Sequence, residues 1–253
     1  MIKVKDLHIS FNGKKVVDGI DLFVPTGHTV VLLGKNGSGK SVILKTVAGL
    51  IDGYDGKIEI DDKDISEFYL NREKTKKNSY EDFFPLAYVF QKGGLFDSMN
   101  VYDNIAFGLR RMNVDESSIK EKVLTSLSRV GLKGNENKLT SELSGGMQKR
   151  VGLARVICLN PVIILFDDPT AGLDPILSDS ISDLILEIRD SLNTTSIVVT
   201  HDLDVARKIA DSIALLYQGK IVFFGPGEDF FNETNEYASQ FIEGETEGPI
   251  SIF

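Results

Sequence analysis

Eight consecutive residues in the first quarter of the chain have the types and spacing that hold phosphate. Residues 34–41 read GKNGSGKS and fit the pattern G-x-x-x-x-G-K-[ST], between a strand-like run, HTVVLL, and a helix-like run. The glycines let backbone amides turn toward phosphate oxygens, and the helix N-terminus adds positive potential. In such a loop Lys40 reaches the β- and γ-phosphates of a nucleotide, and Ser41 binds Mg²⁺. The alternative, a glycine-rich turn before a helix, does not need the lysine.

Two adjacent aspartates follow a second apolar run, VIILF. Asp167 closes this predicted strand, where phosphate-loop NTPases keep a second carboxylate on the Mg²⁺ side of the site. Two distant segments therefore predict the same metal. Asp168 is not explained by the metal alone and needs another role.

The segment ELSGGMQKRVGLARVI, residues 142–157, predicts a helix whose beginning could bind a second anion. Ser144 is a good N-cap, and Gly145 and Gly146 leave the following amides bare. The alternative is an ordinary capped helix. One buried face is expected to hold Met147, Val151, Ala154 and Cys158.

These residues must be positioned by an α/β fold. Apolar runs without alternation predict strands covered on both faces, and therefore a mainly parallel sheet between helices. Residues 213–225 predict a hairpin with Gln218-Gly219 at its turn. Between 178 and 192, apolar residues recur at three- and four-residue steps and predict one helix face. Residues 92–160 are helix-rich, which indicates an inserted helical subdomain.

Composition limits the classes of protein. The 253 residues, 42% of them hydrophobic, suit one large domain or a domain with a subdomain. A net charge of −9 argues against a nucleic-acid partner. The short basic run at 71–77 is interpreted as a solvated loop rather than a lipid-headgroup patch. The single cysteine, Cys158, excludes an internal disulfide, fits a reducing cytosol and is expected in the core rather than as a nucleophile. We expect neither a membrane span nor a signal peptide.

Taken together, the motifs resemble those of the ABC-transporter ATPases over nearly the whole chain. Residues 143–147, LSGGM, resemble the signature motif with Met147 in place of the last glutamine. VIILFD ending at Asp167 is similar to Walker B, and AGLD ending at Asp174 to the D-loop. Gln91 resembles the Q-loop glutamine, His201 the switch histidine, and Phe11 the aromatic that stacks on adenine. Alone, His201 and Phe11 would more often be core residues and Gln91 would indicate nothing; their shared order and spacing assign them.

The resemblance implies a fold, a site and an assembly. The fold would be a phosphate-loop NTPase core with an N-terminal antiparallel β subdomain (1–91 and 161–236 together), a helical subdomain (92–160) and a C-terminal tail (237–253). ATP and Mg²⁺ would be the cofactors. The implied catalytic residues are Asp168, His201 and Gln91, the metal residues Ser41, Gln91 and Asp167, and the nucleotide-binding residues Phe11, Gly34, Lys35, Asn36, Gly37, Ser38, Gly39, Lys40, Ser41, Ser144, Gly145 and Gly146. Because one chain holds one copy of each motif, a second copy would complete each site, with the signature helix of one chain capping the ATP of the other.

Two further stretches resemble the ATPases of Mla-type and Mce-associated lipid transporters. KGGLFDSMNVYDNIAFGLR, residues 92–110, matches their segment after the Q-loop, and SQFIEGETEGPI, residues 239–250, matches their C-terminal element. The implied partners are membrane permease subunits and lipid-binding Mce or Mla components, on the cytoplasmic side of the inner membrane. The apolar tail is expected to bind protein, either its own domain or the partner chain. The transported lipid, its direction and the permease cannot be identified from the sequence.

Two departures from the family keep alternatives open. The stretch between Ile65 and Ala87 is longer than in relatives, and Asp168 stands where relatives usually carry glutamate. The shorter side chain keeps open an ATP-dependent clamp with little turnover. An importer or exporter of another substrate is a further alternative, as is a soluble ABC ATPase of translation or DNA repair, although those usually join two cassettes on one chain or carry long insertions.

Overall fold

The computed structural model describes residues 1–66, 86–232 and 235–251. The chain divides into two compact units, Met1–Tyr69 with Thr195–Phe253, and Leu70–Thr194. The basic run at 71–77 and the long stretch that contains it lie outside the described residues, apart from the ends of that stretch. The subdomain boundaries expected from the sequence stay a prediction.

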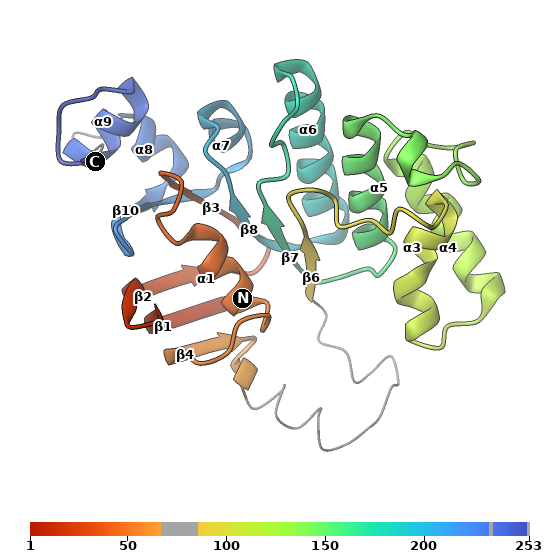
Figure 1. Ribbon diagram of the computed structural model, residues 1–253, viewed down its shortest axis with the longest axis horizontal. Coiled ribbons are helices and arrows are strands. Elements are labelled where there is room, and N and C mark those ends of the chain that lie inside the picture. The colour runs from red at the N-terminus through yellow and green to blue at the C-terminus, as the bar shows by residue number, and fades with distance from the viewer. Residues whose placement is uncertain (67–85, 233–234, 252–253) are drawn as a thin grey trace. The chain divides into compact units, whose positions relative to one another are not determined.

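The first unit begins with an antiparallel sheet in the order β2-β1-β4-β5 (Figure 1). Its strands are β1 (Ile2–Phe11), β2 (Lys14–Val24), β4 (Asp55–Ile60) and β5 (Lys63–Asp64). Along β1, Ile2 and Val4 face inward, and a register shift at Asp6, whose φ is +46°, lets Leu7 and Ile9 face inward too. This bulge keeps Leu7 and Ile9 buried together with Ile2 and Val4, and the expected N-terminal β subdomain is confirmed.

A second set of strands in the first unit has the order β10-β9-β3-β8. Strand β3 pairs in parallel with β8 and β9, and all its residues and those of β8 are buried, as the apolar runs predicted. Strands β9 and β10 form the predicted hairpin, with Tyr217 paired to Lys220 across Gln218-Gly219. The strands are β3 (Thr29–Gly34), β8 (Thr195–Val199), β9 (Ser212–Tyr217) and β10 (Lys220–Pro226). The helices of this unit include α1 (Lys40–Val47), α7 (Leu203–Ile209), α8 (Gly227–Asn232) and α9 (Glu236–Glu243).

The second unit contains the parallel pair β6 (Leu86–Val89) and β7 (Ile163–Asp167). Helices α3 (Val101–Arg111), α4 (Glu116–Arg129) and α5 (Gly145–Ile157) lie within the stretch expected to be helical, together with a short 3₁₀ helix at Thr140–Glu142. Helix α6 (Pro175–Leu192) buries four of the five residues of the predicted face, Ile181, Leu184, Ile185 and Ile188, whereas Leu192 at its end is half-buried. The three helices α3 to α5 pack against one another around a core of Ile105, Leu109, Val123 and Leu127 (Figure 1).

One buried asparagine fixes the loop that enters α3. Asn104 is fully buried, and its side chain accepts a hydrogen bond from the amide of Phe96 at 2.8 Å. It also donates to the carbonyls of Phe96, Met99 and Asn100 at 3.0 to 3.2 Å. Asn100 caps the helix by accepting from the amide of Asp103. Both asparagines of the M-N-V-Y-D-N stretch therefore shape this loop.

Candidate functional site

The predicted phosphate loop joins β3 to α1. Gly34 has φ of +145°, and a Cβ there would lie 2.3 Å from the carbonyl oxygen of Leu216, so only glycine fits. Lys40 is 8% exposed, and its Nζ donates to the carbonyls of Gly34 at 2.6 Å and Lys35 at 2.9 Å. The loop thus folds around the ammonium of its own lysine. Ser41, at the start of the helix, is half-buried.

Two more predicted residues in the first unit are exposed. Phe11, at the end of β1, is 44% exposed, so it is not a core side chain. His201 follows β8 and is also exposed, just before Asp202 caps α7 by accepting from the amides of Asp204 and Val205. The interpretation of either residue as core is therefore wrong. Both remain accessible to a ligand.

In the second unit, Asp167 ends β7 as predicted and is 7% exposed. The hydroxyl of Tyr88, on the paired strand β6, donates to its Oδ2 at 2.8 Å. Burial raises the pKa of Tyr88, and the Asp167 carboxylate raises it further. Tyr88 therefore stays protonated and orients the carboxylate, a contact that the sequence analysis did not anticipate.

Asp168 leaves the strand in a different conformation from its neighbour. Its φ is +48°, in the left-handed region that aspartate tolerates better than most residues. Its carbonyl accepts from the amide of Ala171 at 3.2 Å, which closes a tight turn. The two adjacent carboxylates consequently have different surroundings, Asp167 inside the strand end and half-buried Asp168 on the turn.

Helix α5 begins as predicted at the signature residues. Ser144 is its N-cap and accepts from the amide of Met147 at 3.3 Å, so that amide is not bare. A Cβ on Gly146 would lie 3.3 Å from Leu177, so packing favours glycine there. A Cβ on Gly145 would meet nothing within 4 Å in the described part of the chain. Packing within the described part of the chain therefore does not require glycine at position 145.

The structure adds Lys149 to the candidate site. This lysine of α5 is 8% exposed, and its Nζ donates to the backbone carbonyl of Gln91 and, at 3.4 Å, to that of Asp168. Burial lowers the pKa of Lys149, and the Asp168 carboxylate opposes that shift. The sequence analysis did not single out Lys149, because it is not among the residues of the predicted buried face and a lysine is ordinarily expected to be exposed.

The same helix holds the rest of the Gln91 loop. The Arg155 guanidinium donates to the carbonyls of Gly93 and Gly94 at 2.9 and 2.8 Å. Gln91 itself is exposed, two residues after the end of β6. Asp174 is also exposed and caps α6, where its Oδ1 accepts from the amide of Leu177 at 2.9 Å.

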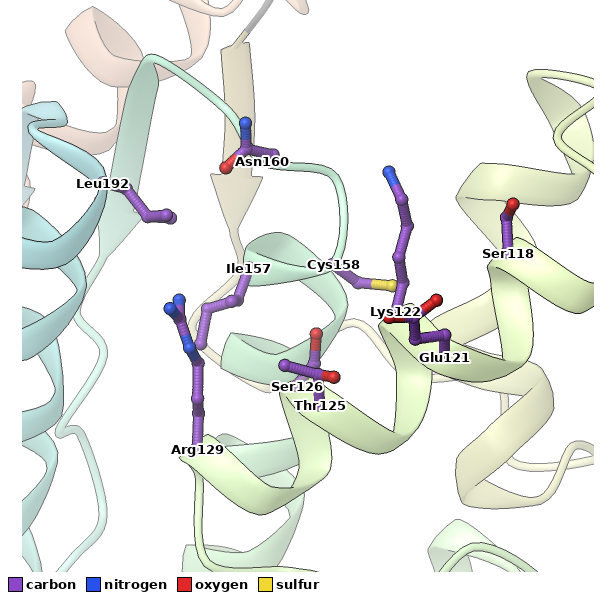
Figure 2. A pocket seen from close by; sticks show the side chains of 10 residues that line it. All are labelled: Ser118, Glu121, Lys122, Thr125, Ser126, Arg129, Ile157, Cys158, Asn160 and Leu192. Carbon is purple, nitrogen blue, oxygen red and sulfur yellow. The ribbon is translucent and has the colours of Figure 1, made fainter.

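A cavity of about 440 Å³ in the second unit has none of the candidate site residues in its lining (Figure 2). Lys122 and Arg129 line it from α4, and Cys158 lines it from the end of α5. Burial raises the pKa of the Cys158 thiol to about 11. Cys158 is therefore a buried, protonated thiol at neutral pH, as expected of a core residue.

Each unit thus gathers part of the predicted set. The first holds Phe11, residues 34–41 and His201, and the second holds Gln91, residues 144–146, Asp167, Asp168 and Asp174. Among the described residues, no group of three or more His, Cys, Asp and Glu could hold a metal by itself.

Comparison with known proteins assigns these motifs to one group. Residues 17–171 match the family model described as "ABC transporter". The chain is 41% identical to the "Probable ribonucleotide transport ATP-binding protein mkl" of Mycobacterium leprae. The match covers 99% of this chain and 71% of that protein. It is 36% identical to the "Intermembrane phospholipid transport system ATP-binding protein MlaF" of Haemophilus influenzae. This match covers 99% of this chain and 93% of that protein. An "Fe(3+) ions import ATP-binding protein FbpC" from Mannheimia succiniciproducens is 34% identical over 99% of the chain and 67% of its own length.

Solved structures show the same fold. cbiO1 of Clostridium perfringens, described as part of the ABC transporter complex cbiONQ, superposes with a TM-score of 0.80 at 30% identity, over 92% of this chain and 91% of its own. The ATP-binding cassette MJ0796 is described as a dimer in a post-hydrolysis state with ADP and Pi. It superposes with a TM-score of 0.77 at 26% identity, over 89% of this chain and 98% of its own. The expected α/β phosphate-loop NTPase fold is confirmed.

Proposed function

This chain belongs to the ABC transporter family as an ATP-binding, ATP-hydrolysing subunit, and from that premise we propose that it drives the movement of phospholipids or related lipids. The main observation in favour of a lipid cargo is the match to MlaF, which spans nearly the whole of both chains. The segments 92–110 and 239–250, which resemble lipid-transport ATPases, support it. The names of mkl and FbpC point to ribonucleotides and Fe³⁺, which makes cargo the property to test.

The cargo test compares the three chemistries on one complex. Tagged protein is isolated from membranes with its bound subunits in detergent and assayed for ATP hydrolysis with phospholipid, ribonucleotide or Fe³⁺ added. Co-purified lipids are identified by mass spectrometry. We expect bound phospholipid and stimulation by phospholipid alone. Stimulation by ribonucleotide or Fe³⁺, with no lipid above the level of a control membrane complex, would refute the lipid proposal.

We assign roles to the site residues on the basis of their chemistry. Lys40 and the amides of residues 34–41 bind the phosphates, and Phe11 stacks on the adenine. Ser41, Gln91 and Asp167 would hold Mg²⁺ through oxygen atoms, directly or through water, and the bound ion would supply positive charge beside the phosphates. Asp168 and His201 position the attacking water and the γ-phosphate. The buried Asp167 carboxylate, oriented by Tyr88, supports the metal role.

These roles predict that the lysine of the loop is indispensable. Lys40→Ala removes the cation that faces the β- and γ-phosphates, and we expect ATP binding or turnover to be lost. Lys45→Ala, at the other end of the same helix α1, is the matched control and should behave like the parent. Isothermal titration with ATP and a phosphate-release assay measure both. Wild-type binding and hydrolysis in Lys40→Ala would overturn the phosphate site.

The working unit in this proposal is a homodimer attached to a permease. Ser144, Gly145 and Gly146 of each copy cap the γ-phosphate bound by the other, and Asp174 organises the facing site. Among the described residues, no helix has the length and apolar character needed to cross a bilayer. Separate membrane subunits would then carry the lipid path, with this chain peripheral on the cytoplasmic side of the inner membrane and Mce- or Mla-type lipid-binding proteins beyond it.

A further inference from the structure

The end of the chain folds back on itself after α9. The helix stops at Gly244, which has a left-handed φ of +68°, and Ile250 returns to become 7% exposed. The side chain of Gln240, 5% exposed, accepts from the amide of Ile250 at 2.6 Å and donates to its carbonyl at 3.1 Å. We name residues 244–251 the hook. The expected binding of the tail to protein is confirmed for Ile250, within its own unit, whereas Ile252 and Phe253 lie outside the described residues.

The tip of the hook is bonded to the phosphate loop. The amide of Ser251 donates to the hydroxyl of Tyr217 at 2.9 Å, and its carbonyl accepts from Nζ of Lys35 at 2.7 Å. Tyr217 is the last residue of β9, next to the Leu216 carbonyl that packs on Gly34. The hook therefore has one anchor on the strand beside the loop and one on the loop itself.

Lys35 connects the hook to Lys40, the lysine that is proposed to bind phosphate. Its carbonyl accepts from Nζ of Lys40 at 2.9 Å and from the amide of Ser38 at 3.2 Å. The same residue thus bonds the hook through its side chain and Lys40 through its backbone. Any movement of Lys35 toward phosphate oxygens changes both contacts.

We propose that the hook restrains the phosphate loop, so that binding of a nucleoside triphosphate and docking of the hook oppose each other. This proposal rests on the phosphate-binding role of residues 34–41. Phosphate oxygens are charged acceptors and compete well with the neutral carbonyls of Ser251, Gly34 and Lys35 for the two ammonium groups. Because coupling is reciprocal, the factor by which the hook weakens ATP binding is the factor by which ATP releases the hook.

Tyr217→Phe tests the restraint by removing one hydroxyl. The ring is retained, while the amide of Ser251 loses its acceptor and the tip of the hook loses an anchor. We expect the Kd for ATP, measured by isothermal titration in EDTA so that no hydrolysis occurs, to fall about three- to tenfold, the effect of one net hydrogen bond. Tyr237→Phe is the matched control, because its ring lies beside that of Tyr217 at 5.8 Å and no described hydrogen bond involves its hydroxyl. Its Kd should equal that of the parent.

A second variant and a second measurement remove the remaining ambiguity. Truncation after Gly244 deletes the hook beyond its first residue and should lower the Kd for ATP at least as much as Tyr217→Phe. Hydrogen exchange in the intact chain should show the amides of Ile250 and Ser251 exchanging faster when ATP is added. Equal or weaker ATP binding in both variants, with normal binding by the parent, would overturn the restraint. A parent that binds no ATP would instead refute the phosphate site.

Discussion

We expect the second aspartate of LFDDPTAGLD, Asp168, to set how fast this protein hydrolyses ATP. The family resemblance places Asp168 where a glutamate is expected, and the aspartate side chain is shorter by one methylene. Misplacement of a reacting group by about 1 Å can cost about 10²-fold in rate. The left-handed backbone at Asp168 and the turn closed by Ala171 set where this shorter carboxylate reaches.

Substitution at Asp168 separates a slow ATPase from a clamp. Asp168→Asn keeps the shape and removes the charge, so we expect turnover to be abolished while ATP affinity stays that of the parent. Asp168→Glu restores the usual length and should keep or raise the rate. Steady-state phosphate release and ATP titration measure both variants. Parental turnover in Asp168→Asn would show that another group positions the water.

Lys149 offers a second residue-scale prediction. It holds the backbone of Gln91 and of Asp168 from one buried ammonium, so Lys149→Met should lower kcat by about 10²-fold through misplacement while the KM for ATP changes little. Lys122→Met, which removes a half-buried lysine of α4, should leave kcat unchanged and is the control. A Lys149→Met protein with the parental kcat would limit this lysine to a packing role.

The pH profile distinguishes positioning by Lys149 from packing. Burial lowers its pKa, so the ammonium is lost at a lower pH than that of an ordinary lysine. As pH rises through that lowered pKa, kcat of the parent should decline, because the neutral amine holds the two carbonyls less strongly. Folding is affected in the opposite sense, since the unfolded chain then binds more protons and stability rises with pH. In Lys149→Met the alkaline decline of kcat should disappear.

At the scale of elements, the spacing of apolar residues along the sequence predicted the strands, a hairpin and a helix face. The buried strands β3, β7 and β8, the hairpin at 213–225 and the inner face of α6 all follow from runs of apolar residues. The bulge at Asp6 and the hook could not be predicted in this way. The bulge interrupts the alternation of its strand, and the hook depends on contacts between residues far apart in the sequence. The same limit explains Tyr88 and Lys149, whose contacts with Asp167 and Asp168 join segments about 80 and 20 residues apart.

The loop before α3 carries an element-scale prediction. Asn104→Ala leaves the amide of Phe96 and three carbonyls without their buried partner, which should cost roughly 2–4 kcal/mol of the free energy of unfolding. Urea denaturation of the purified chain measures the loss. Asn232→Ala, which removes an exposed asparagine bonded to one carbonyl, should cost well under 1 kcal/mol. Equal midpoints for the two variants would show that the loop does not depend on Asn104.

For the whole molecule, the order of the motifs predicted both the fold and the need for a second copy. Each motif was placed by sequence within its own element, and the structure shows Ser144 capping α5 and Asp174 capping α6. The proposed contribution of a second copy to the site is the part that one chain cannot show. Packing within the described chain does not require the glycine at 145, and we expect that residue to approach the ATP of a second copy.

Light scattering of the hydrolysis-blocked chain tests most directly the claim that two copies enclose ATP. Asp168→Asn is measured with ATP and Mg²⁺, with EDTA, and in combination with Ser144→Arg, which places a bulky cation at the cap of α5. We predict a dimer only for Asp168→Asn with ATP and Mg²⁺, and a monomer for the double variant under the same conditions. A chain that stays monomeric with ATP, and occurs as a single copy in the complex isolated from membranes, would contradict the shared site.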